Sequence, residues 1–428
     1  MLMIIQLILG LGLLVFLHEL GHFLAARIFG MRVEKFVIFM DIFDFKLFKF
    51  TKGDTEYSIG WLPIGGYVKI AGMVDESLDK DQLKEEPKPD EFRSFAAWKR
   101  IIVLLGGVIV NLIVGLIIFT CVLYFGEKEY VPATELTEGM YVYEEGEAFG
   151  MQTGDKITHI NGKEIIRIQD SFNKNIFAET VLTIDRNGSE VEVVIPPTYK
   201  NRDILLYSVS NFDAVVDEVI PTSAADKAGM LAGDKITAIN EYQVNAFGDV
   251  KNIVFNLTDS DTLNVEVMRN GQMNDLTCFT DSTRALGFMV ANPLKPTEPY
   301  GVGSSIAYGY KESIDMLNVN IAGLAALFTG KIDFRKSVTG PIGIAKIYGS
   351  NFDAMRFWRI TALISLILAI TNLIPIPALD GGQIVIIMAE TIIGRELSYR
   401  VKMIVQIVGI VLVLGLMLFT VVNDIINF

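Results

Sequence analysis

Three side chains near the amino terminus have the types and the spacing needed for metal chemistry. His18 and His22 are four residues apart, and Glu19 follows His18 directly. On a helix, residues four apart lie on one face, so both imidazoles can reach a single Zn²⁺ ion. The neighbouring carboxylate of Glu19 can take a proton from a water molecule that the metal activates. This His-Glu-x-x-His pattern predicts a hydrolytic metal site with Glu19 as its general base.

A catalytic zinc site usually has three protein ligands, so another residue must supply the third. The remaining histidine, His159, lies in a distant, more polar region, and we interpret it as an ordinary histidine. Asp380 is the better candidate because it follows Pro375 and Pro377 in an otherwise apolar run. These prolines interrupt a helix, which a membrane tolerates only where the backbone lines a buried or water-filled cavity. We therefore predict a broken membrane helix that ends in Asp380, and one Zn²⁺ per chain.

The composition places this site in a membrane protein. The chain has 428 residues, 51% of them hydrophobic, and its mean hydropathy is +0.41. Its net charge of −13 argues against nucleic acid as a partner, which would require basic surfaces. Cys121 and Cys278 form neither a disulfide framework nor a metal cluster by their spacing.

Four apolar stretches are long enough to be transmembrane helices. The predicted spans are residues 1–30, which contain the His-Glu-x-x-His pattern, 99–126, 356–390 and 400–424. Two histidines and a glutamate within a span are costly unless they have a function. Basic residues flank the spans in the connections 31–98 and 390–400, which the positive-inside rule places in the cytoplasm. The predicted class is a polytopic α-helical membrane protein.

The segment between the second and third spans contains an internal repeat. Residues 150–161 recur as 229–240, each with Gly-Asp-Lys-Ile-Thr at its centre, and each copy is followed by an Arg-Asn-Gly hairpin signal. The repeated core resembles PDZ domains, which predicts two inserted β-rich domains at 128–205 and 206–290 on the extracytoplasmic side. Two roles remain open for them: binding of peptide C-termini by β-addition, or exclusion of bulky substrates.

The other connections contain shorter elements. Residues 31–98 form a predicted cytoplasmic region, in which 51–72 alternate as expected for a glycine-kinked β-hairpin. Residues 73–92 have the composition of a solvated loop. Residues 291–355 form a predicted extracytoplasmic linker whose amphipathic helix lies on the membrane surface.

Taken together, these motifs resemble the site-2 protease family, M50-type intramembrane zinc metalloproteases. His-Glu-x-x-His occurs in the first span and Asn-x-x-Pro-x-Pro-x-Leu-Asp-Gly in the third. The tandem PDZ pattern resembles the bacterial branch of regulator-of-sigma-E proteases, and residues 60–70 resemble the family's membrane-associated β-hairpin. This resemblance implies a multi-pass protein of the bacterial plasma membrane, with its active site towards the cytoplasmic side. It also implies substrates that are pre-clipped single-span membrane proteins, such as anti-sigma factors or remnant signal peptides.

The resemblance also assigns residue roles. It implies that His18, His22 and Asp380 bind zinc and that Glu19 is the catalytic base. The residues implied in substrate binding are Asn372, Asn111, Pro375, Pro377, Gly65 and Gly66. For Asn111, hydrogen bonding between helices is an equal alternative, because Gly106-Gly107 replaces the Gly-Pro that is frequent in the family.

The predicted activity is that of a zinc metalloendopeptidase acting within the lipid bilayer. The alternative is a non-proteolytic PDZ membrane scaffold or chaperone with a relict zinc site. A metal transporter is less consistent, because it would need more intramembrane ligands. The presence of Glu19 favours the enzyme, since a structural zinc site requires no base.

Overall fold

The computed structural model describes residues 2–41, 43, 45–73, 88–171, 178–197, 206–256, 262–279, 286–333, 335 and 338–427. These residues fold as two compact units. The helical unit comprises Met1–Lys128 and Tyr300–Phe428, and the inserted unit comprises Glu129–Pro299. Most of the predicted loop at 73–92 lies outside the described residues.

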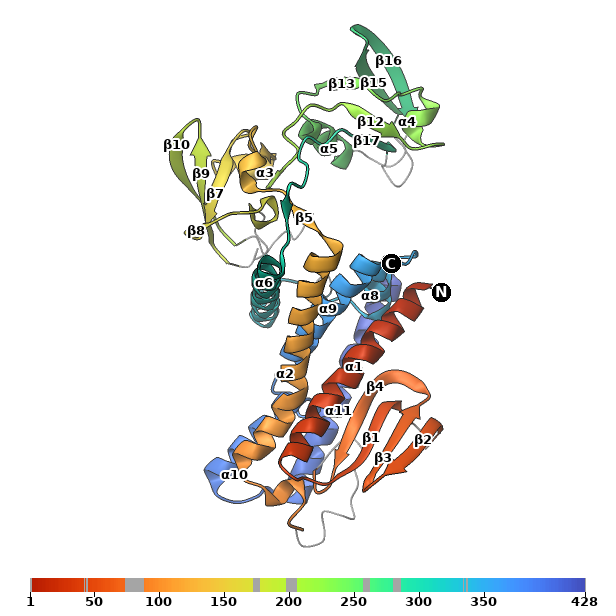
Figure 1. Ribbon diagram of the computed structural model, residues 1–428, viewed down its shortest axis with the longest axis vertical. Helices are drawn as coiled ribbons and strands as arrows, with labels where there is room; N and C mark the ends of the chain where they lie inside the picture. The colour runs from red at the N-terminus through yellow and green to blue at the C-terminus, as the bar shows by residue number, and fades with distance from the viewer. Residues whose placement is uncertain are drawn as a thin grey trace. The chain divides into compact units, whose positions relative to one another are not determined.

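Within the described part of the chain, four helices are long and apolar enough to cross a membrane, as predicted. They are α1 (Leu2–Ile28), α2 (Ala97–Cys121, extended by a π-helical turn to Gly126), α9 (Ala354–Asn372) and α11 (Tyr399–Asn427). Helix α2 packs against both α1 and α9 (Figure 1). Many of their large apolar side chains are exposed, as expected for helices that face lipid.

The third predicted span requires one correction. Helix α9 ends at Asn372, residues 373–379 are not helical, and α10 (Asp380–Ile393) begins at the aspartate. Asp380 therefore starts a new helix instead of ending a broken one. The prolines prevent the continuation of α9, and Gly381 and Gly382 allow the intervening turn to fold back, because a Cβ at either position would collide with a carbonyl of that turn.

The segment between α1 and α2 forms a sheet of four strands. They are β1 (Val33–Met40), β2 (Lys46–Lys52), β3 (Thr55–Gly60) and β4 (Leu62–Ile70), in the order β2-β3-β1-β4. Strand β1 is parallel to β3 and antiparallel to β4. Strand β4 is consequently an edge strand, and it packs against α1.

The predicted hairpin over 51–72 is wrong in its strands, because β2 and β3 form the antiparallel hairpin across Gly53 and Asp54, whereas β4 pairs with β1. Only Trp61 separates β3 from β4, which is shorter than the two-residue loops that commonly close hairpins, and these two strands do not pair. The chain instead turns a corner at Gly60, where a Cβ atom would overlap the backbone of Met40, and β4 pairs with β1.

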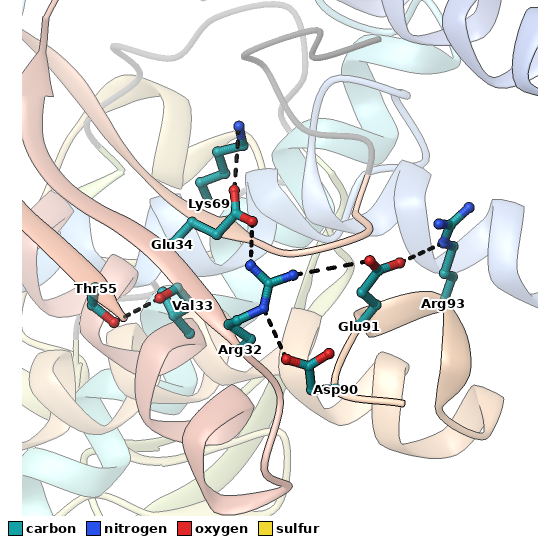
Figure 2. A network of polar contacts seen from close by, with 8 residues as sticks. All are labelled: Arg32, Val33, Glu34, Thr55, Lys69, Asp90, Glu91 and Arg93. Carbon is teal, nitrogen blue, oxygen red and sulfur yellow. Dashed lines mark hydrogen bonds and ion pairs between the residues drawn. The ribbon is translucent and has the colours of Figure 1, made fainter. Parts of the chain in front are cut away.

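A network of ion pairs connects this sheet to the segment that precedes α2 (Figure 2). Arg32 is central: it lies 2.7 Å from Glu34 and 2.9 Å from Asp90. Glu34 on β1 also lies 3.4 Å from Lys69 on β4, and Glu91 pairs with Arg93 at 2.8 Å. These contacts fix β4 relative to the beginning of α2.

Two further helices complete the helical unit. The amphipathic helix predicted near 304–330 is present as α6 (Val302–Phe328), and it packs against α2 and α9. Helix α8 (Pro341–Tyr348) contacts α1 and α11. The buried carboxylate of Asp424 on α11 accepts hydrogen bonds from the backbone N–H groups of Gly340 and Gly343, which satisfies the amino end of α8.

The inserted unit contains two β-rich modules with the same sheet topology. The strand order is β10-β9-β7-β8 in the first module. The corresponding order in the second module is β16-β15-β13-β14. The bounds in the first module are β7 (Lys156–Ile160), β8 (Lys163–Glu164), β9 (Thr180–Arg186) and β10 (Ser189–Ile195). Those in the second are β13 (Lys235–Ile239), β14 (Tyr242–Gln243), β15 (Thr262–Arg269) and β16 (Gln272–Phe279). The sequence repeat is thus a repeat of structure.

Short elements complete these modules. The paired strands are β5 (Glu129–Tyr130) with β18 (Glu298–Pro299), β6 (Tyr141–Val142) with β11 (Tyr207–Ser208), and β12 (Val216–Val219) with β17 (Phe288–Val290). The helices are α3 (Glu144–Glu147), α4 (Ala224–Lys227) and α5 (Phe247–Phe255). Each module has its own apolar core.

Both modules contain the same buried ion pair. The Arg186 guanidinium donates to both carboxylate oxygens of Asp155 at 2.7 Å, and Arg269 donates to those of Asp234 at the same distances. Burial raises the pKa of Asp234, but the hydrogen bonds from Arg269 and from the backbone of Leu231 outweigh it, so that this pKa lies below its ordinary value.

Candidate active site

The structure brings together the three residues that the sequence selected as metal ligands. Nε2 of His18 and Nε2 of His22 are 3.1 Å apart on adjacent turns of α1. Oδ2 of Asp380, at the first residue of α10, lies 3.3 Å and 3.4 Å from these two nitrogens. The three atoms form a nearly equilateral triangle in which every donor type suits zinc.

The dimensions of this triangle fit a tetrahedral Zn²⁺ site. Ligands at 2.0–2.1 Å from zinc are about 3.3 Å from one another along a tetrahedron edge. Oδ2 of Asp380 is also buried without a hydrogen-bond partner, although buried carboxylate oxygens are normally satisfied. A cation at the centre of the triangle would supply the missing partner. His159 lies on β7 in the inserted unit, where its Nδ1 is 3.1 Å from the hydroxyl of Thr158.

Helix α2 orients the imidazoles through their other ring nitrogens. Nδ1 of His22 lies 2.9 Å from the carbonyl oxygen of Val103, so it donates there and leaves Nε2 for the metal. Nδ1 of His18 lies 3.2 Å from Nδ2 of Asn111. Both histidines therefore have the tautomer-fixing contacts that are typical of metal ligands.

The side chain of Asn111 can accept a hydrogen bond from His18 if the nitrogen and oxygen of its amide are exchanged. Its Oδ1 is buried without a partner, while its Nδ2 faces Nδ1 of His18. If His18 binds a metal through Nε2, its Nδ1 carries a proton and requires an acceptor. Exchanging the amide nitrogen and oxygen places Oδ1 against this proton and satisfies both groups. Asn111 is 0% exposed, so it contacts His18 and not bulk solvent.

Glycines allow α2 to approach the histidines this closely. A Cβ atom at Gly107 would lie 2.5 Å from Cε1 of His18 and 2.6 Å from Nε2 of His22. At Gly21, a Cβ atom would overlap the backbone of Gly106. The Gly106-Gly107 pair is thus a requirement of the packing around the imidazoles.

A cavity of 270 Å³ adjoins the triangle. Its lining includes the predicted residues Glu19, Asn111, Asn372, Gly65 and Gly66. The backbone of β4 passes beside Glu19, since a Cβ at Gly66 would be 3.6 Å from Cγ of this residue. Nδ2 of Asn372 lies 3.1 Å from Nε2 of His18, at the edge of the metal triangle.

Two of the predicted substrate-binding residues, Pro375 and Pro377, do not line this cavity. The following residues Ala378 and Leu379 do so instead. The prolines act on the backbone by ending α9, which sets the position of Asp380 at the start of α10.

The sequence reasoning did not identify two glutamines that line the cavity, Gln383 and Gln406. A signal was available for each. Gln383 is three residues after Asp380 and therefore lies on the same helix face. Gln406 is an uncharged polar residue within the last apolar span, where such residues require a partner.

Two histidines and an aspartate that share a cavity with Glu19, in a unit whose long helices are apolar enough to cross a membrane, are the arrangement expected of a membrane-embedded metallopeptidase. Comparison with known proteins agrees: residues 6–416 match the model of peptidase family M50, and the chain belongs to this family. It is an intramembrane zinc metalloprotease of the site-2 type, and Zn²⁺ is its cofactor.

Curated relatives resemble this chain along nearly its whole length. The regulator of sigma-E protease RseP of Escherichia coli is 27% identical, with 96% of each chain covered. The regulator of sigma E protease of Haemophilus influenzae is 27% identical, with 97% of each chain covered. The zinc metalloprotease RasP of Geobacillus kaustophilus is 27% identical, with 99% of this chain and 98% of the relative covered.

Proposed function

We propose that the zinc ion is bound by His18, His22 and Asp380, and that the enzyme cleaves membrane-spanning segments of pre-clipped single-span proteins with Glu19 as general base. The observation that carries the proposal is the ligand triangle, in which Oδ2 of Asp380 has no protein hydrogen-bond partner. The proposed substrate types are anti-sigma factors and remnant signal peptides. Anti-sigma factors are suggested by the relatives' names, which describe regulators of sigma E.

The reaction is the addition of water to a peptide carbonyl and the loss of the amine. The bound Zn²⁺ supplies Lewis acidity that polarises the carbonyl and acidifies the attacking water. Glu19 takes the proton of this water as the new carbon–oxygen bond forms, and passes it to the nitrogen as the carbon–nitrogen bond breaks. Asn372, whose Nδ2 lies 3.1 Å from Nε2 of His18, would donate a hydrogen bond to the oxygen on which negative charge develops.

A helical substrate must unwind before it can react, because its carbonyls are engaged in intrahelical hydrogen bonds. Strand β4 is an edge strand that passes through the cavity lining at Gly65 and Gly66. It can take the unwound segment as an additional strand, which replaces the hydrogen bonds lost on unwinding. Asn111, in contrast, acts as a positioning residue for His18.

The proposed topology has the active site towards the cytoplasm and the two modules, as PDZ domains, on the extracytoplasmic side. Basic residues at the inner ends of the spans support this orientation. Among the described residues, β17 pairs only with β12, and a peptide added at its other edge would extend this sheet. This favours peptide binding in the second module over a purely steric role.

The test uses the full chain in liposomes with a model single-span substrate. We expect the wild type to cleave it, and both Glu19→Gln and a zinc chelator to abolish cleavage, while Glu19→Gln retains its zinc. A wild type that binds zinc but leaves several trimmed substrates intact would support the scaffold alternative and contradict the proposal.

A further inference from the structure

Two glutamines face each other across α10 and α11 in the wall of the catalytic cavity. Nε2 of Gln383 donates to Oε1 of Gln406 at 2.6 Å and to the carbonyl oxygen of Pro377 at 3.3 Å. Gln406 is only 2% exposed, and both residues belong to the cavity lining. The pair is therefore a fixed polar group in an intramembrane site where polar groups are costly.

Each glutamine has half of its amide unused. Gln383 uses only its N–H groups, so its Oε1 accepts no hydrogen bond from the described residues. Gln406 uses only its Oε1, so its Nε2 donates to no described residue. The pair thus presents one acceptor and one donor, which are the complements of the N–H and C=O groups of a peptide.

The position of the pair relative to the metal ligands gives a distance scale. Gln383 follows Asp380 by three residues on α10, which is about 4.5 Å along the helix axis on the same face. An extended peptide advances about 3.3 Å per residue. The pair is therefore within about two residues of the bond that the zinc centre would hydrolyse.

An extended substrate needs partners on both of its edges. If the substrate pairs with β4, every second residue of the substrate directs its N–H and C=O groups towards that strand. The N–H and C=O groups of the residues between them point away from β4. In a cavity within the membrane, those that point away are unsatisfied unless the protein supplies partners. The cavity lining contains both β4 and the two glutamines.

We propose that Oε1 of Gln383 and Nε2 of Gln406 bind the N–H and C=O groups of the unwound substrate near the scissile bond, on the edge that β4 does not use. This proposal rests on the proposed proteolytic function. The pair recognises backbone and not side chains, so it permits cleavage of varied sequences. The alternative is a purely structural hydrogen bond between α10 and α11.

The test replaces single peptide bonds of a substrate with esters, which removes one N–H at a time. Synthetic single-span peptides of about 25 residues carry one ester at each of the four positions on either side of the scissile bond. Cleavage is measured with the full chain in liposomes, for wild type, Gln383→Met and Gln406→Met. Methionine has a similar volume and no hydrogen-bonding amide.

For the wild type, we expect an ester at one position near the scissile bond to reduce kcat/KM about 10-fold through loss of its partner on Gln383. This penalty disappears in Gln383→Met, where no acceptor remains. Esters at positions that pair with β4 reduce cleavage equally in both proteins, which provides an internal reference. A structural role predicts the same ester profile in both, and that result would overturn the proposal.

A matched control is Gln6→Met, because Gln6 is a buried intramembrane glutamine that bonds to the carbonyl of Gly349, outside the cavity lining. We expect its ester profile to equal that of the wild type. Gln406→Met distinguishes the two halves of the pair, since it should retain the ester penalty at the Gln383 position. If the wild type cleaves none of the all-amide peptides, the proposed function fails. If it cleaves them and the profiles coincide, only the role of the glutamines fails.

Discussion

Asp380 in the helical unit and Asp234 in the inserted unit are both carboxylates removed from water, but their surroundings differ. Asp234 is 0% exposed, receives two hydrogen bonds from Arg269 and a third from the backbone of Leu231. Asp380 lies beside two imidazole nitrogens, and its Oδ2 has no hydrogen-bond partner. The first module repeats the satisfied arrangement with Asp155 and Arg186.

The difference separates carboxylates that stabilise the fold from carboxylates that bind an ion or a substrate. A buried charge whose hydrogen bonds are complete contributes to a fixed fold, and removal of one partner leaves the other unpaired. A buried oxygen without a partner is expensive, and it persists where an ion or a substrate completes its coordination. The same substitution, aspartate to asparagine, should therefore reduce proteolysis at Asp380 and reduce the stability of the inserted unit at Asp234.

The largest expected difference is in proteolysis. Asp380→Asn removes a proposed zinc ligand and with it several kcal/mol of transition-state stabilisation, so kcat/KM should fall about 1,000-fold or more. Asp234→Asn should leave cleavage of a single-span substrate nearly unchanged at neutral pH. The measurement is cleavage in liposomes under equal protein loading. Comparable losses in both variants would remove the distinction between the two carboxylates.

The converse effect is expected in the stability of the inserted unit. Asp234→Asn should destabilise the second module by about 3 kcal/mol, near the lower end for broken buried ion pairs, because Arg269 remains 27% exposed. Hydrogen exchange of the β13 and β15 amides in the full chain measures this. Asp380→Asn provides the control, and it should leave the exchange of these amides unchanged.

The pH dependence of this stability has a definite sign. Because the pKa of Asp234 is lowered in the folded module, its contribution is present above the unfolded pKa of about 3.9 and is lost as the pH falls through the folded value. Acidification from neutral pH to below the unfolded pKa should therefore reduce the protection of these amides, relative to their intrinsic exchange rates, more in the wild type than in Asp234→Asn. An equal pH response of the two proteins would show that this ion pair is not the acid-sensitive group.

A smaller effect on the metal site is expected when a methyl group is added beside the proposed ligands and the ligands themselves are kept. Gly107→Ala places a methyl group where the imidazoles of His18 and His22 lie, so zinc affinity should fall about 10- to 100-fold. Gly115→Ala on the same helix is the control, since its new methyl group would crowd the buried side chain of Leu366 on α9 and not the imidazoles. Chelator competition measures both affinities, and equal values for the two variants would contradict the account.

The smallest effect concerns the orientation of His18. Asn111→Leu removes the acceptor that we assign to Nδ1 of His18, and zinc should bind about 10-fold more weakly. Asn111→Asp keeps an acceptor and should restore most of the affinity. If Asn111 instead donates to the imidazole, the aspartate variant should bind zinc no better than the leucine variant.

The proposed zinc ligands could be selected from the sequence because their chemistry is expressed in short motifs. His18 and His22 are related by helical spacing, and Asp380 was found through the two prolines that interrupt its span. Their proximity in the structure agrees with this prediction. The four apolar spans were likewise visible, because lipid-facing helices need long apolar runs.

Features that depend on partners remote in sequence were not predictable. The position of β1 between β3 and β4 was missed, since local alternation identifies strands but not their neighbours. For Asn111, hydrogen bonding between helices was one predicted alternative, but its partner His18, 93 positions away, was not predicted. Gln383 and Gln406 gained significance only when α10 and α11 placed them in one cavity.

The most direct test of the central claim is the zinc content of the purified full chain, measured for four proteins. We predict one zinc per chain for the wild type, Glu19→Gln and Asp234→Asn, and loss of zinc from Asp380→Asn under the same chelator concentration. If Asp380→Asn retained zinc with unchanged affinity, the carboxylate would not be a ligand, and the account of the metal site would be wrong.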